Sequence, residues 1–212
     1  MSRTRVPRFC RTTRWFHWTF ALSFCSLAAS GTLLLCRAEL SIEGADVATL
    51  IEFHKITAIV FLTAPWLIGL SGDRRAWLRD LSEAARFSRD DLVWLARQPL
   101  AMLGKAELPA QYKLNAGQKL NALAVAGISG AMIVTGLHLW REPGSFLALV
   151  VHVGGFLAWI PAFCVHIFMA VINPGTRPAL RAMVRGDVDR DWAAHHHARW
   201  LASIEQDPSD PS

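Results

Sequence analysis

Four histidines lie inside or at the edges of long apolar segments, where an ionisable side chain is costly and is therefore a candidate for function. His17 lies near the start of the first segment, His54 near the start of the second, and His152 and His166 on the last. The 14-residue step between His152 and His166 is ~1400° of helical rotation, only ~40° short of four full turns. Both side chains are thus expected on one helix face, ~21 Å apart along the axis.

Each of these two histidines has a partner of matching depth on another segment. His54 matches His152 near one membrane surface, and His17 matches His166 near the other. Two imidazoles fill both axial positions of a haem iron, and a six-coordinate iron suits electron transfer rather than oxygenation. The two pairs therefore predict two haem b groups stacked across a bilayer, with the four histidines as iron ligands.

Other interpretations of the histidines stay open. A single histidine within a membrane is often only a hydrogen-bonded core residue. His138, near the outer end of the third segment, competes for the outer haem but is interpreted as an interfacial residue beside Trp140. His195–His197 are expected at the surface of a soluble tail, where metal binding is a further hypothesis. Basic residues at levels suited to haem propionates are Arg8, Arg11, Arg14 and Lys55.

The elements that must position these histidines are four stretches long enough to cross ~30 Å of hydrocarbon, which takes ~20 helical residues. They lie at about residues 15–36, 50–70, 120–140 and 146–172. Arginines precede the first stretch as in a signal peptide. Its length, aromatic start and lack of a small-residue cleavage site indicate a retained helix instead. Pro161 is expected to kink the last helix between its two histidines.

The distribution of basic residues predicts the orientation. Five Lys and Arg residues fall within residues 1–14, nine within 71–119 and five after residue 172, whereas the loop after the first stretch is acidic. The positive-inside rule then places both termini and the middle loop in the cytoplasm. The net charge of +5 is explained by these loops, so no nucleic-acid partner is expected. The four cysteines form no CxxC or CxxCH motif, which excludes zinc ribbons and covalent c-type haem.

We therefore expect an all-α integral membrane protein, a four-helix bundle with both termini cytoplasmic. Residues 1–175 would form the membrane domain and residues 176–212 a cytoplasmic tail. The loop of residues 71–113 is too polar to insert, but its apolar residues recur at three- and four-residue steps. It is predicted to form amphipathic helices on the inner membrane surface, in contact with lipid.

The segment Lys113-Leu114-Asn115-Ala116-Gly117-Gln118-Lys119 has two interpretations. It could simply begin the third helix, with Asn115 as the cap and Lys119 extending to the interface. It could equally line a polar pocket that receives a quinone head group, since amides donate hydrogen bonds to carbonyls and glycine permits close approach. The residues alone leave both interpretations open.

Several motifs resemble the cytochrome b (gamma) subunit of respiratory formate dehydrogenase over nearly the whole chain. They are Arg14-x-x-His17-Trp18, Phe53-His54, Asn115-Ala116-Gly117-Gln118-Lys119, the His152 and His166 spacing, Met183-x-x-Gly186-x-Val188, Trp192-Ala193 and His196-His197-x-Arg199-Trp200. The Asn115–Lys119 segment and the tail motif are the specific ones. A lone histidine pair would not identify a family.

The resemblance implies a dihaem anchor of the bacterial inner membrane. An iron–sulfur (beta) subunit docks outside and carries electrons from a molybdenum or tungsten (alpha) subunit that oxidises formate. His54 and His152 would hold the outer haem and His17 and His166 the inner one. Menaquinone or ubiquinone would be reduced near the cytoplasmic face, in a pocket lined by Asn115, Gly117 and Gln118. The chain itself would not oxidise formate, and complexes of this family can be trimers of heterotrimers.

Three alternatives remain at this stage. Anchors of thiosulfate reductase and nickel–iron hydrogenase use similar helices, so the dehydrogenase partner cannot be read from this chain. A cytochrome b561 type of transmembrane reductase also uses two haems in a four-helix core. A cofactor-free transporter would use histidine for protons, but it would also need acidic residues in the spans, and Glu52 at the edge of the second is the only one.

Overall fold

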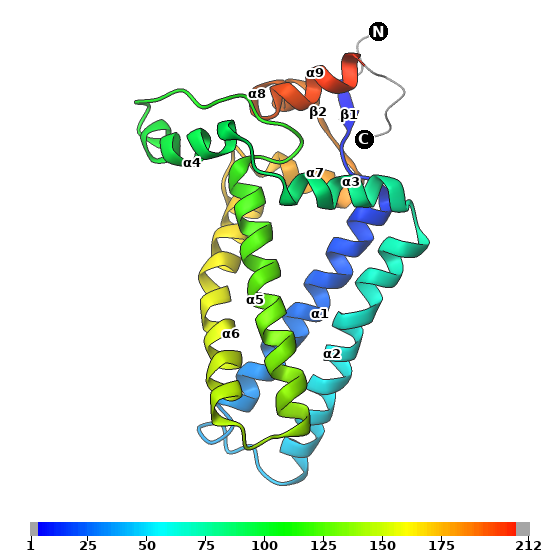
Figure 1. Cartoon of the computed structure of the whole chain (residues 1–212), viewed down its shortest axis with the longest axis vertical. Coiled ribbons are helices and arrows are strands. Elements are labelled where there is room, and N and C mark those ends of the chain that lie inside the picture. Colours follow the sequence, from blue (N-terminus) through cyan, green and yellow to red (C-terminus); the bar gives the residue numbers. More distant parts are fainter. Residues whose placement is uncertain (1–3, 207–212) are drawn as a thin grey trace. The chain divides into compact units, whose positions relative to one another are not determined.

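Four long helices dominate the chain in the computed structural model, which describes residues 4–206 (Figure 1). They are α1 (Arg11–Leu35), α2 (Ala45–Ser71), α5 (Ala116–Arg141) and α6 (Phe146–Ile167), the last continuing as a π-helix, η1 (Phe168–Ile172). All four are long and apolar enough to cross a membrane. The prediction of a helical protein with four spans is thereby confirmed. The bundle and the orientation of the termini stay predictions.

Shorter elements make up the rest of the described chain. The loop between the second and third spans forms α3 (Arg74–Ala85) and α4 (Arg89–Met102), and the tail forms α7 (Pro178–Arg185), α8 (Arg190–His196) and α9 (Ala198–Gln206). Two three-residue strands, β1 (Arg5–Pro7) and β2 (Asp187–Asp189), complete the list. The predicted tail runs on to residue 212, of which 207–212 lie outside the described residues.

Two compact units divide the chain. The hairpin unit comprises residues 9–78 and holds α1 and α2. The main unit comprises residues 1–8 together with 79–212 and holds α5, α6, most of the middle loop and the tail. Each unit therefore contains one pair of candidate spans.

Aromatic packing closes one end of the hairpin unit. Phe16 on α1 contacts Trp66 and Trp77, with ring centroids 5.8 and 5.4 Å apart. The indole of Trp77 lies directly on the backbone of Gly69, where a Cβ would come within 2.5 Å of the ring. The backbone N–H of Asp73 donates to the Thr12 hydroxyl at 2.8 Å, which fixes the end of α2 against the start of α1.

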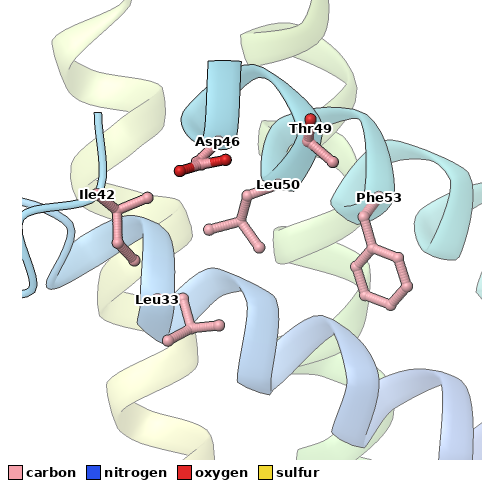
Figure 2. A pocket seen from close by; sticks show the side chains of 6 residues that line it. All are labelled: Leu33, Ile42, Asp46, Thr49, Leu50 and Phe53. Carbon is pink, nitrogen blue, oxygen red and sulfur yellow. The ribbon is translucent and has the colours of Figure 1, made fainter. Parts of the chain in front are cut away.

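An open hollow of about 560 Å³ lies at the other end of the hairpin unit. Figure 2 shows its six lining residues, Leu33, Ile42, Asp46, Thr49, Leu50 and Phe53. Most of the lining is aliphatic or aromatic, and Asp46 supplies its one carboxylate. None of the candidate histidines lines this hollow.

In the main unit the strand of residues 5–7 pairs with the tail. β1 and β2 run antiparallel with Val6 opposite Val188, and both valines are buried. The backbone N–H of Arg8 extends the contact by donating to the Gly186 carbonyl at 2.7 Å. The sequence did not predict this sheet, because a three-residue strand has too few positions to show alternation.

Replacing Gly69 by alanine should destabilise the hairpin unit. The new methyl group would overlap the buried Trp77 ring, and overpacking of this kind costs ~1–3 kcal/mol. We expect a lower thermal unfolding temperature in detergent, followed by tryptophan fluorescence. Gly144→Ala is the matched control, since a Cβ at Gly144 meets nothing within 4 Å. Equal unfolding temperatures for the two variants would contradict the packing described here.

Candidate functional site

His54 is held on α2 by a hydrogen bond to the neighbouring helix. Its Nδ1 lies 2.7 Å from the hydroxyl of Ser30 on α1. That hydroxyl donates in turn to the carbonyl of Ser26 at 2.9 Å, within its own helix. When Ser30 donates its proton to this carbonyl, the Ser30 oxygen accepts from the imidazole of His54. Nδ1 of His54 is then the protonated nitrogen, and the lone pair lies on Nε2.

His152 on α6 is held in the same way by α5. Its Nδ1 donates to the carbonyl of Met132 at 3.0 Å and lies 3.1 Å from the Thr135 hydroxyl. Thr135 donates its own proton to the Ala131 carbonyl at 2.8 Å. His152 therefore also carries its proton on Nδ1 and its lone pair on Nε2. A histidine that binds a metal through Nε2 commonly has its other nitrogen fixed by such a bond.

A glycine lies against each of these two imidazoles, and at Gly136 a Cβ would be tightly placed. A Cβ on Gly31 would lie 3.5 Å from Cε1 of His54, and a Cβ on Gly136 would lie 3.1 Å from Cε1 of His152. Both rings are half-buried. His54 and His152, on two separate helix pairs, thus share an acceptor for Nδ1, a lone pair on Nε2 and a contact with a glycine. Two imidazoles of this kind fit axial ligation of a haem iron.

His17 and His166 are placed differently. The half-buried His17 packs edge-on against Trp18, with ring centroids 5.2 Å apart. His166 is exposed and lies one residue before the last residue of α6, where the chain changes to the π-helix η1. Single π-turns within helices are frequent at functional sites. Each predicted pair draws one histidine from each unit, so the pairing stays a prediction.

His138 and Lys55, which the sequence offered as possible haem contacts, have other partners. His138 is exposed at the end of α5, with Nε2 3.9 Å from the carboxylate of Glu142. Lys55 donates to Glu52 at 2.8 Å. The interpretation of His138 as an interfacial residue stays a prediction.

The start of α5 is a capping box. The Asn115 side chain accepts from the backbone N–H of Gln118 at 2.9 Å, and the Gln118 side chain accepts from the backbone N–H of Asn115 at 3.0 Å. Gly117 packs against Trp94 of α4, where a Cβ would lie 3.4 Å from the ring. The three residues predicted to line a quinone pocket thus share one half-buried helical turn.

Lys119 does not extend to an interface. Its ammonium group donates to both carboxylate oxygens of Asp91 on α4, at 3.3 and 3.1 Å, and both side chains are buried. Burial by itself raises the pKa of Asp91, but hydrogen bonds from Ser88 and Lys119 outweigh it and hold that pKa below its ordinary value. The Asp91 carboxyl is therefore ionised at neutral pH and pairs with a lysine cation.

A second buried cluster joins the N-terminal segment to the tail. The Arg8 guanidinium donates to the Lys113 carbonyl at 2.6 Å and to Nε2 of His197 at 2.9 Å. The other ring nitrogen of His197 donates to the Tyr112 carbonyl at 2.7 Å. Arg8 also lies over the rings of Trp192 and Trp200. Because all of these contacts lie within the main unit, they fix the loop that leads into α5.

Two expectations are corrected by this cluster. Arg8 is fully buried and bonded to the tail, so it is not available as a propionate partner. His197 was expected at the surface but is 1% exposed, since two tryptophans of the polar tail supply an apolar cover. His195 is exposed and His196 half-buried. The described residues contain no group of three or more side chains suited to a metal ion.

The charges of this cluster follow from its burial. Burial lowers the pKa of Arg8 to about 10, although Asp80 and Glu83 act in the opposite direction. Arg8 therefore stays a cation at neutral pH. Burial, with Arg8 as a neighbouring charge, lowers the pKa of His197 to about 3. A neutral His197 is what its bonds require, because an imidazolium could not accept from Arg8.

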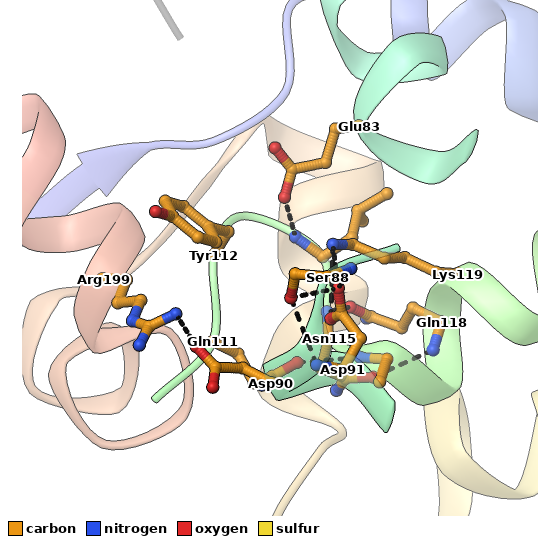
Figure 3. Close-up of polar contacts among 12 residues, drawn as sticks. Glu83, Ser88, Asp90, Asp91, Gln111, Tyr112, Asn115, Gln118, Lys119 and Arg199 are labelled. Atoms are coloured by element: carbon orange, nitrogen blue, oxygen red, sulfur yellow. Dashed lines mark hydrogen bonds and ion pairs between the residues drawn. The ribbon is translucent and has the colours of Figure 1, made fainter. Parts of the chain in front are cut away.

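Further contacts join α3, α4 and the tail to the segment that leads into α5 (Figure 3). The Gln111 side chain accepts from the buried Ala116 N–H at 2.9 Å, and the Gln111 carbonyl accepts from the Arg199 N–H at 3.1 Å. Glu83 of α3 accepts from the Leu114 N–H at 3.1 Å, and Arg199 pairs with Asp90 of α4. The turn that begins α5 is therefore held from three directions.

The sequence singled out the four histidines as candidate ligands, but not the residues that contact His54 and His152. Ser30 and Thr135 are small polar residues within apolar runs, and that position is the sequence signal that could have identified them. Met132 acts through its backbone, so its side chain gives no signal. Asp91 is the third residue of α4, and its pairing with Lys119 depends on how two helices meet.

Comparisons with known proteins identify a family and several relatives of this chain. A family described as prokaryotic cytochrome b561 matches residues 8–186. The cytochrome b556(Fdn) subunit of nitrate-inducible formate dehydrogenase from Escherichia coli K12 is 29% identical over 127 residues, which cover 56% of this chain and 57% of that protein. The alignment thus spans little more than half the length of that relative.

Two other relatives align over almost the whole chain. The formate dehydrogenase cytochrome b556(fdo) subunit of Escherichia coli K12 is 27% identical over 96% of this chain and 95% of its own length. The formate dehydrogenase cytochrome b556 subunit of Haemophilus influenzae is 30% identical over 96% of this chain and 87% of its own length.

The neutral state of His197 predicts a pH-dependent stability. Its folded pKa of about 3 lies below the ordinary value of ~6.5. Between those values the unfolded chain binds a proton that the folded chain does not, so the free energy of unfolding falls as the pH falls. The limiting slope is ~1.4 kcal/mol per pH unit. Between pH 7.5 and 5 this group should remove up to ~2 kcal/mol.

Thermal unfolding at several pH values checks this prediction with two variants. His197→Gln should show a shallower pH dependence than the wild type, because glutamine can donate and accept but does not titrate. His195→Gln, which alters an exposed residue in the same run, should keep the wild-type profile. The same slope in both variants would contradict a buried neutral His197.

Proposed function

This chain belongs to the prokaryotic cytochrome b561 family, and from that premise we propose that it is the dihaem b subunit anchoring a formate dehydrogenase in the bacterial inner membrane. Family membership implies haem b, and the four apolar helices make the chain a multi-pass membrane protein. Formate as the substrate of the complex rests on the names of the three relatives.

The observation that carries the proposal is the matched setting of His54 and His152. Each has Nδ1 fixed by an acceptor on the adjacent helix, which leaves the lone pair on Nε2. Each also lies against a glycine of the neighbouring helix, Gly31 for His54 and Gly136 for His152. A buried imidazole that served only packing would not need this arrangement twice. His54 and His152 are therefore the proposed ligands of the outer haem, and His17 and His166 those of the inner one.

When bound, haem b held by two imidazoles supplies one-electron redox chemistry without a free coordination position. The protein's part is to hold each imidazole neutral and in one tautomer. Ser30 and the Met132 carbonyl do this for the outer pair. The proposed donor of electrons is an iron–sulfur subunit outside the membrane, supplied by a molybdenum or tungsten subunit. The proposed acceptor is menaquinone or ubiquinone near the cytoplasmic face.

The capping box at the start of α5 supports a quinone site there. The amide oxygens of Asn115 and Gln118 accept from backbone N–H groups, so the amide NH₂ groups point away from the helix backbone. Those NH₂ groups are hydrogen-bond donors suited to the carbonyls of a quinone head group. The helix-start and quinone-pocket interpretations are therefore compatible, because different atoms of the same amides serve each.

Haem content tests the ligand assignment. A dithionite-reduced minus oxidised spectrum, with pyridine haemochrome quantitation, should give two b haems per wild-type chain. His54→Ala and His17→Ala should each retain one haem, because each breaks a different pair. His138→Ala is the matched control and should retain two. A well-folded wild-type protein without haem would refute the proposed function.

Reporter fusions test the orientation. A green fluorescent protein fused at the C-terminus should fluoresce, and alkaline phosphatase there should be inactive, because the basic tail is expected in the cytoplasm. Alkaline phosphatase fused after Ser41, in the acidic first loop, should be active. The reverse pattern would show that the chain is inserted the other way round.

A further inference from the structure

A buried ion pair joins α4 to the first turn of α5. Lys119 lies one helical turn beyond Asn115, and its backbone N–H donates to the Asn115 carbonyl at 3.0 Å. The Lys119 and Asp91 side chains are only 5% and 4% exposed. Removing two charges from water carries a desolvation penalty, and a buried pair is often no more stabilising than apolar residues of the same size. Stability alone therefore does not explain this pair.

Asp91 is fixed from a second side as well. Its carboxylate accepts from the backbone N–H and from the hydroxyl of Ser88, both at 2.8 Å, as part of the capping box that begins α4. Two capping boxes, one on each helix, are thus connected through a single ion pair (Figure 3). The position of α4 along α5 is defined by hydrogen bonds with fixed directions, which apolar packing would not provide.

The same face of α4 carries Trp94, three residues after Asp91. Its ring lies over Gly117, with 3.4 Å between the ring and a Cβ built on that glycine. Trp94 thereby walls one side of the turn that holds Asn115 and Gln118. A shift of α4 would move this wall relative to the amides, while the haem-binding histidines lie on other turns or other helices.

We propose that Asp91 and Lys119 are positioning residues for the quinone. The pair holds α4 and Trp94 over the first turn of α5, so that the Asn115 and Gln118 amides and the flat Trp94 ring define one face of a head-group pocket. Because the pair is neutral as a whole, it places no net charge beside an uncharged ligand. This inference rests on the proposed quinone site and adds two residues to it.

The neighbouring acid provides a matched control. Asp90 precedes Asp91 on α4 but pairs with Arg199 of the tail, and its side chain is 40% exposed. Exposed pairs of this kind contribute little, because water screens them. Asp90 and Asp91 thus share a helix, a side-chain type and a charge, but Asp90 pairs with the tail and Asp91 with α5.

The experiment uses the complete formate dehydrogenase complex in detergent, with formate as donor and either decylubiquinone or a short-chain menaquinone as acceptor. For the quinone that the wild type reduces, Asp91→Asn should raise KM at least fivefold, with kcat within twofold. Haem per chain and formate-dependent reduction of a viologen dye should not change. Asp90→Asn should leave KM within twofold of the wild type.

The double variant Asp91→Leu with Lys119→Met covers the case in which Asp91→Asn fails to fold. It leaves no buried charge unpaired, so it should fold and retain haem, yet its KM should stay raised because the directional bonds are gone. An unchanged KM in a haem-retaining Asp91→Asn protein, or in the double variant, would overturn the positioning role. Equal effects of Asp90→Asn and Asp91→Asn would do the same. A wild-type complex that reduces the dye but neither quinone would instead refute the proposed function.

Discussion

Hydrocarbon offers no hydrogen-bond partner, so every polar side chain within a span must find one in the helices themselves. Several serine and threonine hydroxyls in the spans of this chain follow that constraint. Serine and threonine hydroxyls donate to carbonyls four residues earlier, as Ser23, Thr57 and Thr63 do. Ser30 and Thr135 do the same, and each places its hydroxyl oxygen within hydrogen-bonding distance of a histidine on the neighbouring helix. These hydroxyls, with the Met132 carbonyl, orient the imidazoles of His54 and His152 from the neighbouring helices.

At the ends of the spans and in the loops, buried charged groups also find partners within the protein. Water could solvate Arg8, Asp91 and Lys119, yet all three are buried and each has charged or polar partners. Their partners come from segments far apart in the sequence: the N-terminal strand, the middle loop and the tail. The result is a set of directional contacts around the turn that begins α5. The histidines and this turn are thus supported by different means, one within helix pairs and the other across segments.

The sequence predicted what depends on local composition. Four apolar stretches became four long helices, because ~20 consecutive apolar residues are a strong and unambiguous signal. Asn115 was recognised as a cap from its type and place before an apolar run. The role of Ser30 was not predictable, since it depends on the rotation of α1 against α2. The burial of His197 was missed because the tail is polar on average, although the Trp192 and Trp200 rings pack against its imidazole. The β1–β2 sheet was missed because its strands are short and far apart.

The link between the two ends of the chain constrains how the protein is made. Arg8 and His197 are 189 positions apart, and the strands beside them pair across a similar interval. A ribosome adds ~5–20 residues per second, so ~10–40 s separate the synthesis of the two partners. All four spans leave the ribosome before the tail that completes the cluster. The contacts that hold the turn before α5 are therefore completed only after the residues around His197 have been made.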